Sequence, residues 1–233
     1  MTQPTVLAFD TSGPHCSAAL LIGGKIVATR HEEMTRGQAE RLFPMLDDVM
    51  GDIGAVWEEI DAIGVGTGPG NFTGIRIAVS AARGLALSLG IPAIGVTSFE
   101  ALRQLAGSNE PDPEMVSLCS THGWYLQLFE GNRPKGQPAE QKRGGDITGD
   151  VAAMLGARCL GHDADVFSDL TGEETGYQYA EFDDAAGFRV SECIAMVAAR
   201  KFLAGPVTDR PSPVYIRPAD AAPSRDEPIT ILP

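Results

Sequence analysis

Residues 66–87, GTGPGNFTGIRIAVSAARGLAL, decide the fold of this chain. Five of the first nine positions are Gly or Pro, and a run of helix-forming residues follows them. Pro69-Gly70 is a strong turn pair, and Asn71 or Thr73 can cap a helix by accepting a hydrogen bond from a backbone N–H that lacks a partner within the helix. The stretch therefore predicts a corner at which a strand turns into a helix.

A glycine-rich corner at a helix N-terminus raises the question of what lies against its backbone. Unpaired N–H groups and the positive end of the helix dipole suit such a corner to an anion. Gly68, Gly70 and Thr73 are therefore candidate contacts of a phosphate. The spacing matches neither GxGxxG nor GxxxxGK[ST], however, and the corner contains no Lys. The corner alone does not identify a phosphate site.

The helix after the corner has one side with almost no side-chain bulk, because small residues recur on it at intervals of four. These residues are Gly74, Ala78, Ala82 and Ala86. Another backbone can approach that side closely. It belongs either to the protein's own sheet or to a partner, and both interpretations stay open. Arg76 and Arg83 share another face, where they meet solvent or carboxylates.

The pattern on either side of the corner predicts alternating strands and helices. Gly23-Gly24 marks a two-residue hairpin. We expect strands over 5–10, 16–22, 25–30, 61–68, 91–97, 116–120 and 124–130, and helices over 37–50, 56–60, 72–89, 148–156 and 190–203. Pro44 should kink the helix over 37–50 or move its start later. Residues 133–150 read as loop, and the order of elements predicts a mixed α/β sheet.

A polar, Pro-rich stretch near 105–114 predicts the crossing into a second lobe. We expect a first lobe over 1–105 and a second lobe over 106–204. A closing strand and a mobile tail over 205–233 should return to the first lobe.

The stretch FDTSGPHCSAALL at 9–21 is a second candidate site. A carboxylate at the end of a first strand, followed by hydroxyls in a hairpin turn, resembles the first phosphate loop of actin, hexokinase and Hsp70-type proteins. In that interpretation Asp10 holds a metal-bound water, and Thr11 and Ser12 donate to phosphate. In the alternative, Asp10 accepts hydrogen bonds from backbone N–H groups and shapes the turn. The residues alone do not separate the two.

The composition is that of an acidic globular protein. The 233 residues include 18 Lys and Arg against 31 Asp and Glu, a formal net charge of −13. Such a surface repels phosphate backbones, so we do not expect the chain to bind nucleic acid by itself. We see no signal peptide and no apolar stretch of membrane-spanning length. Four scattered cysteines without a CxxC pair favour reduced thiols, and we expect a cytoplasmic protein.

The motifs of several enzyme classes are missing from the sequence. The four histidines include no pair at i, i+4, which disfavours common zinc motifs, and no GxSxG elbow is present. Cys119 near His122 is more typical of a buried thiol than of a catalytic pair. The many acidic residues of 163–184 read as a solvated surface.

Four segments together resemble the TsaB (YeaZ) family: VLAFDTS near the start, then ERLFPMLDDVM, IDAIGVGTGPGNFTGIRIAVSAARGLAL and IPAIGVTSFEAL. The likeness covers residues 5–105, and PVYIR at 213–217 resembles the family's closing P-x-Y-x-R strand. The resemblance implies a two-lobed actin/Hsp70-like α/β fold (ASKHA, ribonuclease H-like) with mixed central sheets.

The family is needed to make N6-threonylcarbamoyladenosine at position 37 of tRNAs that read codons beginning with A. The resemblance implies a non-catalytic subunit that pairs with the catalytic paralogue TsaD, and it implies homodimers in isolation. It also implies that the ATPase TsaE joins the complex, that TsaC-type enzymes make the adenylate intermediate, and that tRNA is reached only through the complex. We expect no metal and no tightly bound cofactor, with ATP or ADP at the complex interface.

The family's two contact helices correspond here to 38–50 and 72–88. The interface residues that the resemblance implies are Leu42, Met45, Leu46, Gly74, Arg76, Ala78, Ala82 and Arg83. Gln38-Ala39-Glu40 stands where the family often has His-Ser, so contacts at that helix start are not carried over. The resemblance implies that the glycine corner is a remnant of a nucleotide-binding ancestor. Its vestigial nucleotide-binding residues would be Asp10, Thr11, Ser12, Gly68, Gly70 and Thr73.

Two other functions compete with this one. An ATP-binding small-molecule kinase or ATPase of the same superfamily would use Asp10 and the corner over 66–74 on Mg–ATP, but the expected second-lobe loops are not recognisable. A peptidase would need a nucleophile or metal that the sequence does not show.

Overall fold

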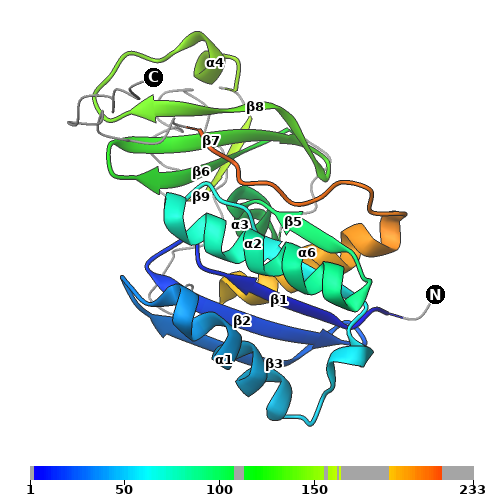
Figure 1. The fold of residues 1–233 in the computed structure, drawn as a ribbon. Coiled ribbons are helices and arrows are strands. Elements are labelled where there is room, and N and C mark those ends of the chain that lie inside the picture. Colours follow the sequence, from blue (N-terminus) through cyan, green and yellow to red (C-terminus); the bar gives the residue numbers. More distant parts are fainter. Residues whose placement is uncertain (1–2, 108–112, 155–156, 162, 164–188, 217–233) are drawn as a thin grey trace, which may run out of the picture.

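Two β-sheets, one above the other in Figure 1, organise the chain. The computed structural model describes residues 3–107, 113–154, 157–161, 163 and 189–216. The mobile tail expected after 216 lies outside these residues.

The first sheet has the strand order β3-β2-β1-β4-β5. Its strands are β1 (Val6–Asp10), β2 (His15–Ile22), β3 (Lys25–Glu33), β4 (Ala62–Gly66) and β5 (Ala93–Val96). The first three pair antiparallel, and β4 runs parallel to both β1 and β5. The sheet is therefore mixed, as the order of elements in the sequence predicts. β1 and β4 are buried on both faces, which explains their nearly continuous apolar sequences.

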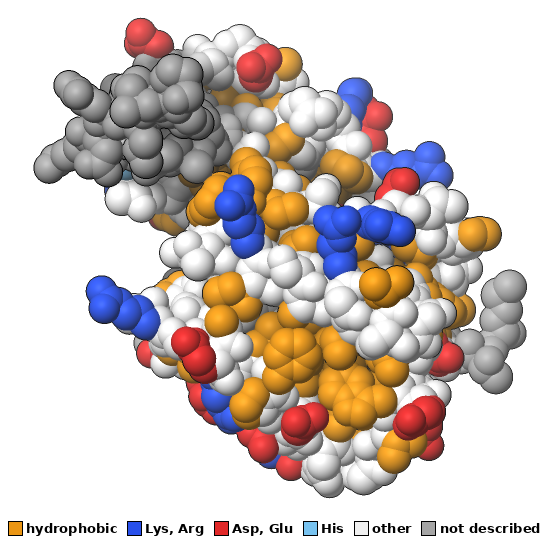
Figure 2. Space-filling view, viewed as in Figure 1, with side chains coloured by type: hydrophobic (Ala, Val, Ile, Leu, Met, Phe, Trp, Pro, Cys, Tyr) orange, Lys and Arg blue, Asp and Glu red, His pale blue; other side chains and the backbone are white. Residues whose placement is uncertain are grey.

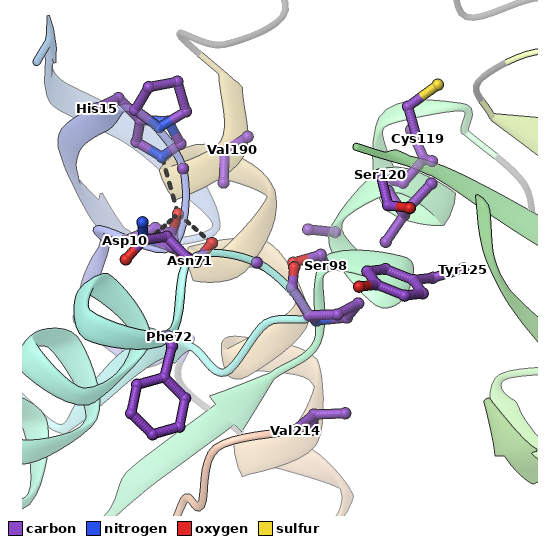
Figure 3. Close-up of a pocket in the computed structure, with 18 of the residues that line it drawn as sticks. Asp10, His15, Asn71, Phe72, Ser98, Cys119, Ser120, Tyr125, Val190 and Val214 are labelled. Atoms are coloured by element: carbon purple, nitrogen blue, oxygen red, sulfur yellow. Dashed lines mark hydrogen bonds and ion pairs between the residues drawn. The ribbon is translucent and has the colours of Figure 1, made fainter. Parts of the chain in front are cut away.

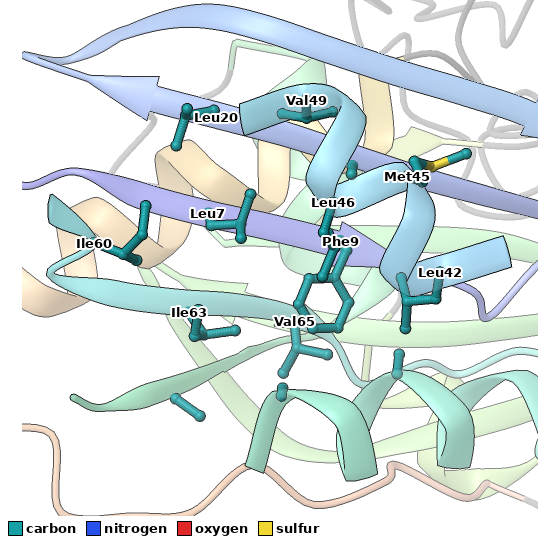
Figure 4. Close-up of a cluster of buried hydrophobic side chains, with 14 of the residues drawn as sticks. Leu7, Phe9, Leu20, Leu42, Met45, Leu46, Val49, Ile60, Ile63 and Val65 are labelled. Carbon is teal, nitrogen blue, oxygen red and sulfur yellow. The ribbon is translucent and has the colours of Figure 1, made fainter. Parts of the chain in front are cut away.

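Two long helices cover one face of this sheet: α1 (Gln38–Gly51) and α2 (Phe72–Leu89). A short 3-10 turn, η1 (Trp57–Glu59), precedes β4. Leu7 and Phe9 of β1 point to this side and pack with side chains of α1, as Figure 4 shows. The helix α1 starts at Gln38 and runs through Pro44, so the later start is wrong. Buried residues before and after Pro44 favour an uninterrupted helix.

Two other helices cover the opposite face: α3 (Ser98–Leu105) and α6 (Val190–Ala204). Val6 and Ala8, which alternate with Leu7 and Phe9, pack here against α6. The helix α6 falls in the stretch 106–204 that we expected to form the second lobe, yet it packs on the first sheet. Its apolar residues are the only described cover for much of this face.

The second sheet has the order β8-β7-β6-β9. Its strands are β6 (Glu114–Ser120), β7 (Gly123–Glu130), β8 (Arg133–Lys142) and β9 (Arg158–Gly161), and the short helix α4 (Gly149–Ala152) packs on it. The loop expected over 133–150 is wrong, because β8 occupies its first part. Two prolines and several polar residues hide this strand from an apolar pattern, and its place at the sheet edge tolerates them.

The structure differs from three further expectations drawn from the sequence. The helix expected over 148–156 is described only as α4. The closing segment around 213–217 is not a strand over its described residues, although it returns to the first lobe through a hydrogen bond from Val214 N to Thr67 O, 2.8 Å long. By length and composition alone α2 could span a membrane, which no stretch was expected to do. Its buried side packs on the sheet, however, and core helices pass the same test.

A buried ion pair joins the lobes. Arg103 of α3 donates from Nε to Glu114 Oε2 of β6 at 2.6 Å, and from Nη1 to Asn132 Oδ1 at 2.8 Å. Glu114 is fully buried, and Arg158 approaches its second oxygen at 3.6 Å. Beside this pair, Phe99 and other apolar residues of α3 pack with β6 and β7. The orientation of the lobes therefore rests on α3.

Candidate functional site

A cleft of about 1060 Å³ lies between the two lobes. The first lobe contributes the β1–β2 turn, the glycine corner, α3 and the start of α6, and the second lobe contributes the β6–β7 turn. Figure 3 shows Asp10, His15, Asn71 and Phe72 on one side and Cys119, Ser120 and Tyr125 on the other. The segment 214–216 also lines the cleft.

Asp10 lies at the end of β1, and its carboxylate is almost fully buried. Its Oδ2 accepts hydrogen bonds from Ser12 N at 3.1 Å and Ser12 Oγ at 2.9 Å, and lies 2.8 Å from His15 Nε2. Thr11 is also engaged, because its hydroxyl donates to Gly74 O at 2.7 Å. These are the bonds of a carboxylate that shapes its own turn. The hydroxyls proposed for phosphate are both used within the protein.

The glycine corner is packed against this same turn. A Cβ on Gly66 would overlap Asp10 Oδ1, one on Gly70 would overlap Ser12 O, and one on Gly74 would overlap Thr11 O. Asn71 N donates to Ser12 O at 2.6 Å, while Asn71 Oδ1 caps α2 by accepting from Gly74 N at 3.0 Å. The atoms that come so close to these glycines therefore belong to residues 10–12 of the chain's own β1–β2 turn: the Asp10 side chain at Gly66, and backbone at Gly70 and Gly74.

The cleft offers little to a nucleotide phosphate. Among the described residues that line it there is no Lys or Arg, and its ionisable groups include Asp10, His15 and His122. In the described part of the chain, no cluster of three or more His, Cys, Asp or Glu is arranged to hold a metal ion. A triphosphate with its cation would need compensating charges that these residues do not supply.

Cys119 in the cleft and His31 beside it both have shifted pKa values. Cys119 is exposed as a residue and not buried as expected. Its sulfur is still partly shielded from solvent, and this shielding and a hydrogen bond to Asp163 raise the pKa of the thiol. A raised pKa keeps the thiol protonated and disfavours a nucleophile. His31, whose ring centroid lies 5.2 Å from that of His15, has a lowered pKa because of burial and of His15 itself.

Most of the residues expected at a partner interface are inside the protein. Leu42, Met45, Leu46, Ala78 and Ala82 are each no more than 1% exposed, and Gly74 is buried against the β1–β2 turn. Figure 4 shows Leu42, Met45 and Leu46 beside the strands of the first sheet. These six residues cannot touch a partner while the fold is intact. Of the expected set, Arg76 and Arg83 are exposed.

The outward sides of the same two helices form a different surface, which we call the α1–α2 face. It contains exposed Phe43 of α1 and the partly buried residues Ile77, Ala81 and Leu85 of α2, and partly buried Trp57 of η1 adjoins it. Figure 2 shows apolar side chains gathered in this region, with acidic and basic groups around them. Phe43 is 46% exposed, and Leu87 nearby on α2 is 83% exposed. Exposed apolar patches of this kind are typical of protein–protein contacts.

The mixed five-stranded sheet, its helical layers and the second lobe across a cleft form a two-lobed α/β fold of the actin/Hsp70-like class. The chain resembles the TsaB (YeaZ) proteins. It is 37% identical over 107 residues to the tRNA threonylcarbamoyladenosine biosynthesis protein TsaB of Haemophilus influenzae, covering 46% of this chain and 44% of that protein. For TsaB of Escherichia coli the identity is 38% over 99 residues, covering 42% of each chain. The chain thus spans less than half the length of these curated relatives.

A family model described as TsaD, tRNA N6-adenosine threonylcarbamoyltransferase, matches residues 25–125. Among solved structures, YeaZ from Pseudomonas aeruginosa shares the fold with a TM-score of 0.64 and 23% identity, covering 91% of this chain and 99% of that chain. A second Pseudomonas structure, described as an uncharacterized protein with similarity to peptidase YeaZ, gives a TM-score of 0.66 at 24% identity, covering 92% and 100%. The fold likeness therefore covers about twice as much of the chain as the sequence likeness to the curated relatives does.

Sequence reasoning missed several residues of the cleft and the face. It gave no role to His15, which stacks on His31 and bonds Asp10, or to Tyr125 across the cleft. It counted Phe43 with Leu42 and Leu46 on the apolar face of the helix over 37–50, whereas the structure buries the other two and leaves Phe43 46% exposed. Phe43 fits the helical periodicity of the buried residues, so the pattern alone did not mark it as a surface residue.

Proposed function

We propose that this chain is a cytoplasmic, non-catalytic subunit in the synthesis of N6-threonylcarbamoyladenosine in tRNA, and that it acts by pairing with a TsaD-type threonylcarbamoyltransferase. The apolar α1–α2 face carries the proposal. It lies within residues 25–125, which the TsaD family model matches, and the chain is similar to a TsaB protein over 46% of its length.

The matched region explains how such a pair could form. Since the family model for the enzyme covers β3 through the start of β7 of this chain, the enzyme has counterparts of α1 and α2. Two like faces can pack around a pseudo-twofold axis and bury their apolar residues in a four-helix contact. The same geometry allows two copies of this chain to pair when the enzyme is absent. TsaE and ATP or ADP would join the assembled complex.

The cleft favours this role over that of a kinase. Asp10, Thr11 and Ser12 spend their hydrogen bonds on the turn and the corner, and the described lining lacks a cation for phosphate. Calorimetry with Mg–ATP tests the kinase directly. Micromolar binding to the isolated chain that disappears in Asp10→Ala would favour a kinase over a docking subunit.

The docking face is tested by Phe43→Asp, measured by size-exclusion chromatography with light scattering on mixtures with the organism's own TsaD. The wild-type chain should give a one-to-one complex. An acidic group in the middle of the buried apolar contact should weaken it by about 100-fold, because a desolvated charge without a partner costs several kcal/mol. Modification of tRNA by the reconstituted system should fall in parallel.

Ile147→Asp is the matched control, since Ile147 is 38% exposed and lies in the second lobe. It should leave the complex unchanged. Substitutions of Leu42 or Ala78 are unsuitable because both residues belong to the core. A Phe43→Asp variant that binds TsaD as the wild type does would place the contact elsewhere.

A further inference from the structure

Arg76, on the exposed side of α2, is held between two aromatic side chains. Its guanidinium carbon lies 3.8 Å from the centroid of the Phe72 ring and 5.8 Å from that of Tyr215. Its Nε donates a hydrogen bond to Tyr215 Oη at 2.9 Å, and the two rings lie 4.9 Å apart. An exposed arginine side chain normally loses rotamer entropy when it binds a partner. Because Arg76 is already held in place in the free protein, less entropy remains to be lost on binding.

The second ring comes from a distant part of the sequence. Tyr215 belongs to the segment 211–216, and 139 positions separate it from Arg76. Val214 N fixes this segment to Thr67 O at 2.8 Å, and buried Pro211 lies close to Gly95. The segment thus crosses the ends of β4 and β5 before it reaches α2.

The charge of Arg76 is not neutralised within the described residues, where it has no acidic partner. Arg30, Arg41 and Arg103 all pair with carboxylates there. Because Nε is used by Tyr215, the two terminal nitrogens of Arg76 remain as a fork of donors. That fork matches the two oxygens of a carboxylate.

Arg76 also borders the α1–α2 face. It is on one exposed line of α2 with Arg83 and Leu87, while Ile77 and Ala81 follow the adjacent, partly buried line. A protein that covers the apolar face would therefore reach Arg76 at the edge of the contact. There, partial exclusion of water strengthens an ion pair.

We propose that Arg76 is a preorganised anchor for a carboxylate side chain of the protein that covers the α1–α2 face. Phe72 and Tyr215 position it, so the segment 211–216 takes part in docking although it is remote from α1 in sequence. The anchor rests on the proposed function, since it needs a partner at this face. A carboxylate is favoured over an RNA phosphate because the net charge of −13 repels RNA.

The test is isothermal titration with the organism's TsaD at about 0.1 M and about 0.5 M salt. Arg76→Gln should weaken binding about tenfold at low salt and should remove most of the difference between the two salt concentrations. Tyr215→Phe keeps the ring but loses the hydroxyl, and it should weaken binding about threefold. Arg133→Gln in the second lobe removes an exposed charge remote from α2 and should bind as the wild type does. Urea unfolding of each variant checks that the fold is kept.

The possible outcomes separate the anchor from the function. A tight wild-type complex that Arg76→Gln leaves unchanged would overturn the anchor and spare the proposed function. Failure of the wild-type chain to bind TsaD would overturn both. If Arg76→Gln kept its affinity for TsaD but lowered the affinity of the complex for tRNA, the anion would be a phosphate and the carboxylate proposal would be wrong.

Discussion

At the scale of single residues, Gly74 shows why the glycine corner cannot accept side chains. A Cβ at this position would overlap the carbonyl oxygen of Thr11, and Thr11 in turn donates its hydroxyl to Gly74 O. Gly74→Ala should therefore force the β1–β2 turn away from α2. We expect it to lower the free energy of unfolding by about 2–3 kcal/mol, as overpacking of a core does. Urea denaturation followed by circular dichroism measures this.

Gly84 supplies the control on the same helix. It is exposed, and a Cβ there meets nothing within 4 Å. Gly84→Ala should raise the free energy of unfolding by about 0.5–1 kcal/mol, because alanine loses less backbone entropy in a helix. Equal effects of the two substitutions would mean that the close packing at Gly74 is not what constrains it.

The residues of this corner also show what the sequence could and could not predict. The strand–turn–helix corner and the Asn71 cap were predictable, because turn pairs and caps are local signals. Whether the small side of α2 receives the chain's own backbone or a partner was not, because small residues suit both. Burial decided it: Leu42 and Ala78 belong to the core, so the docking surface that we propose contains Phe43 and Ile77 instead.

At the scale of elements, the start of α2 depends on one side chain. Asn71 Oδ1 accepts from Gly74 N, and no other side chain caps this end among the described hydrogen bonds. Asn71→Ala should lower the free energy of unfolding by about 1 kcal/mol. Asn71→Asp keeps an acceptor and places a negative charge at the positive end of the helix, so it should be at least as stable as the wild type. Thermal unfolding of both variants checks this, and an alanine variant as stable as the aspartate would show that the cap contributes little.

Elements were predictable where their pattern was apolar and periodic, as for α2 and α6. Elements were not predictable where a position at the edge of a sheet removed the need for an apolar, periodic pattern. The strand β8 carries Pro134 and Pro138, and among the described strands it pairs with β7 alone, so its sequence reads as loop. The segment 211–216 returns to the first lobe without forming a strand. Its place is set by Tyr215 and Val214, which the sequence pattern does not reveal.

At the scale of the whole molecule, the packing of the two lobes against each other depends on the buried ion pair of Arg103 and Glu114. Arg103→Met should lower the free energy of unfolding by about 3–5 kcal/mol, because it leaves a fully buried carboxylate without its main partner. Adding Glu114→Gln removes that charge and should recover more than half of the loss. Urea unfolding of the single and double variants measures this coupling. A double variant no more stable than Arg103→Met would show that the buried charge is not the cause.

The overall class of fold was predictable from the first hundred residues and from the resemblance that they carry. The packing of α6 on the first sheet was not predictable. Nothing in the local pattern of 190–204 tells that this helix crosses back past the second sheet to cover Val6 and Ala8. Such long-range packing depends on which apolar faces remain uncovered, and that is known only once every element has been placed.

The return of α6 has a consequence for synthesis on the ribosome. The last strand of the first sheet ends at Val96, whereas α6 ends at Ala204, which is 108 residues later (204 − 96). At about 5–20 residues per second, translation needs roughly 5–20 s to cover that interval. Throughout that interval, the apolar face of the first sheet that α6 will cover lacks this helix. The growing chain is therefore most exposed to aggregation, and most in need of chaperones, during the translation of its second lobe.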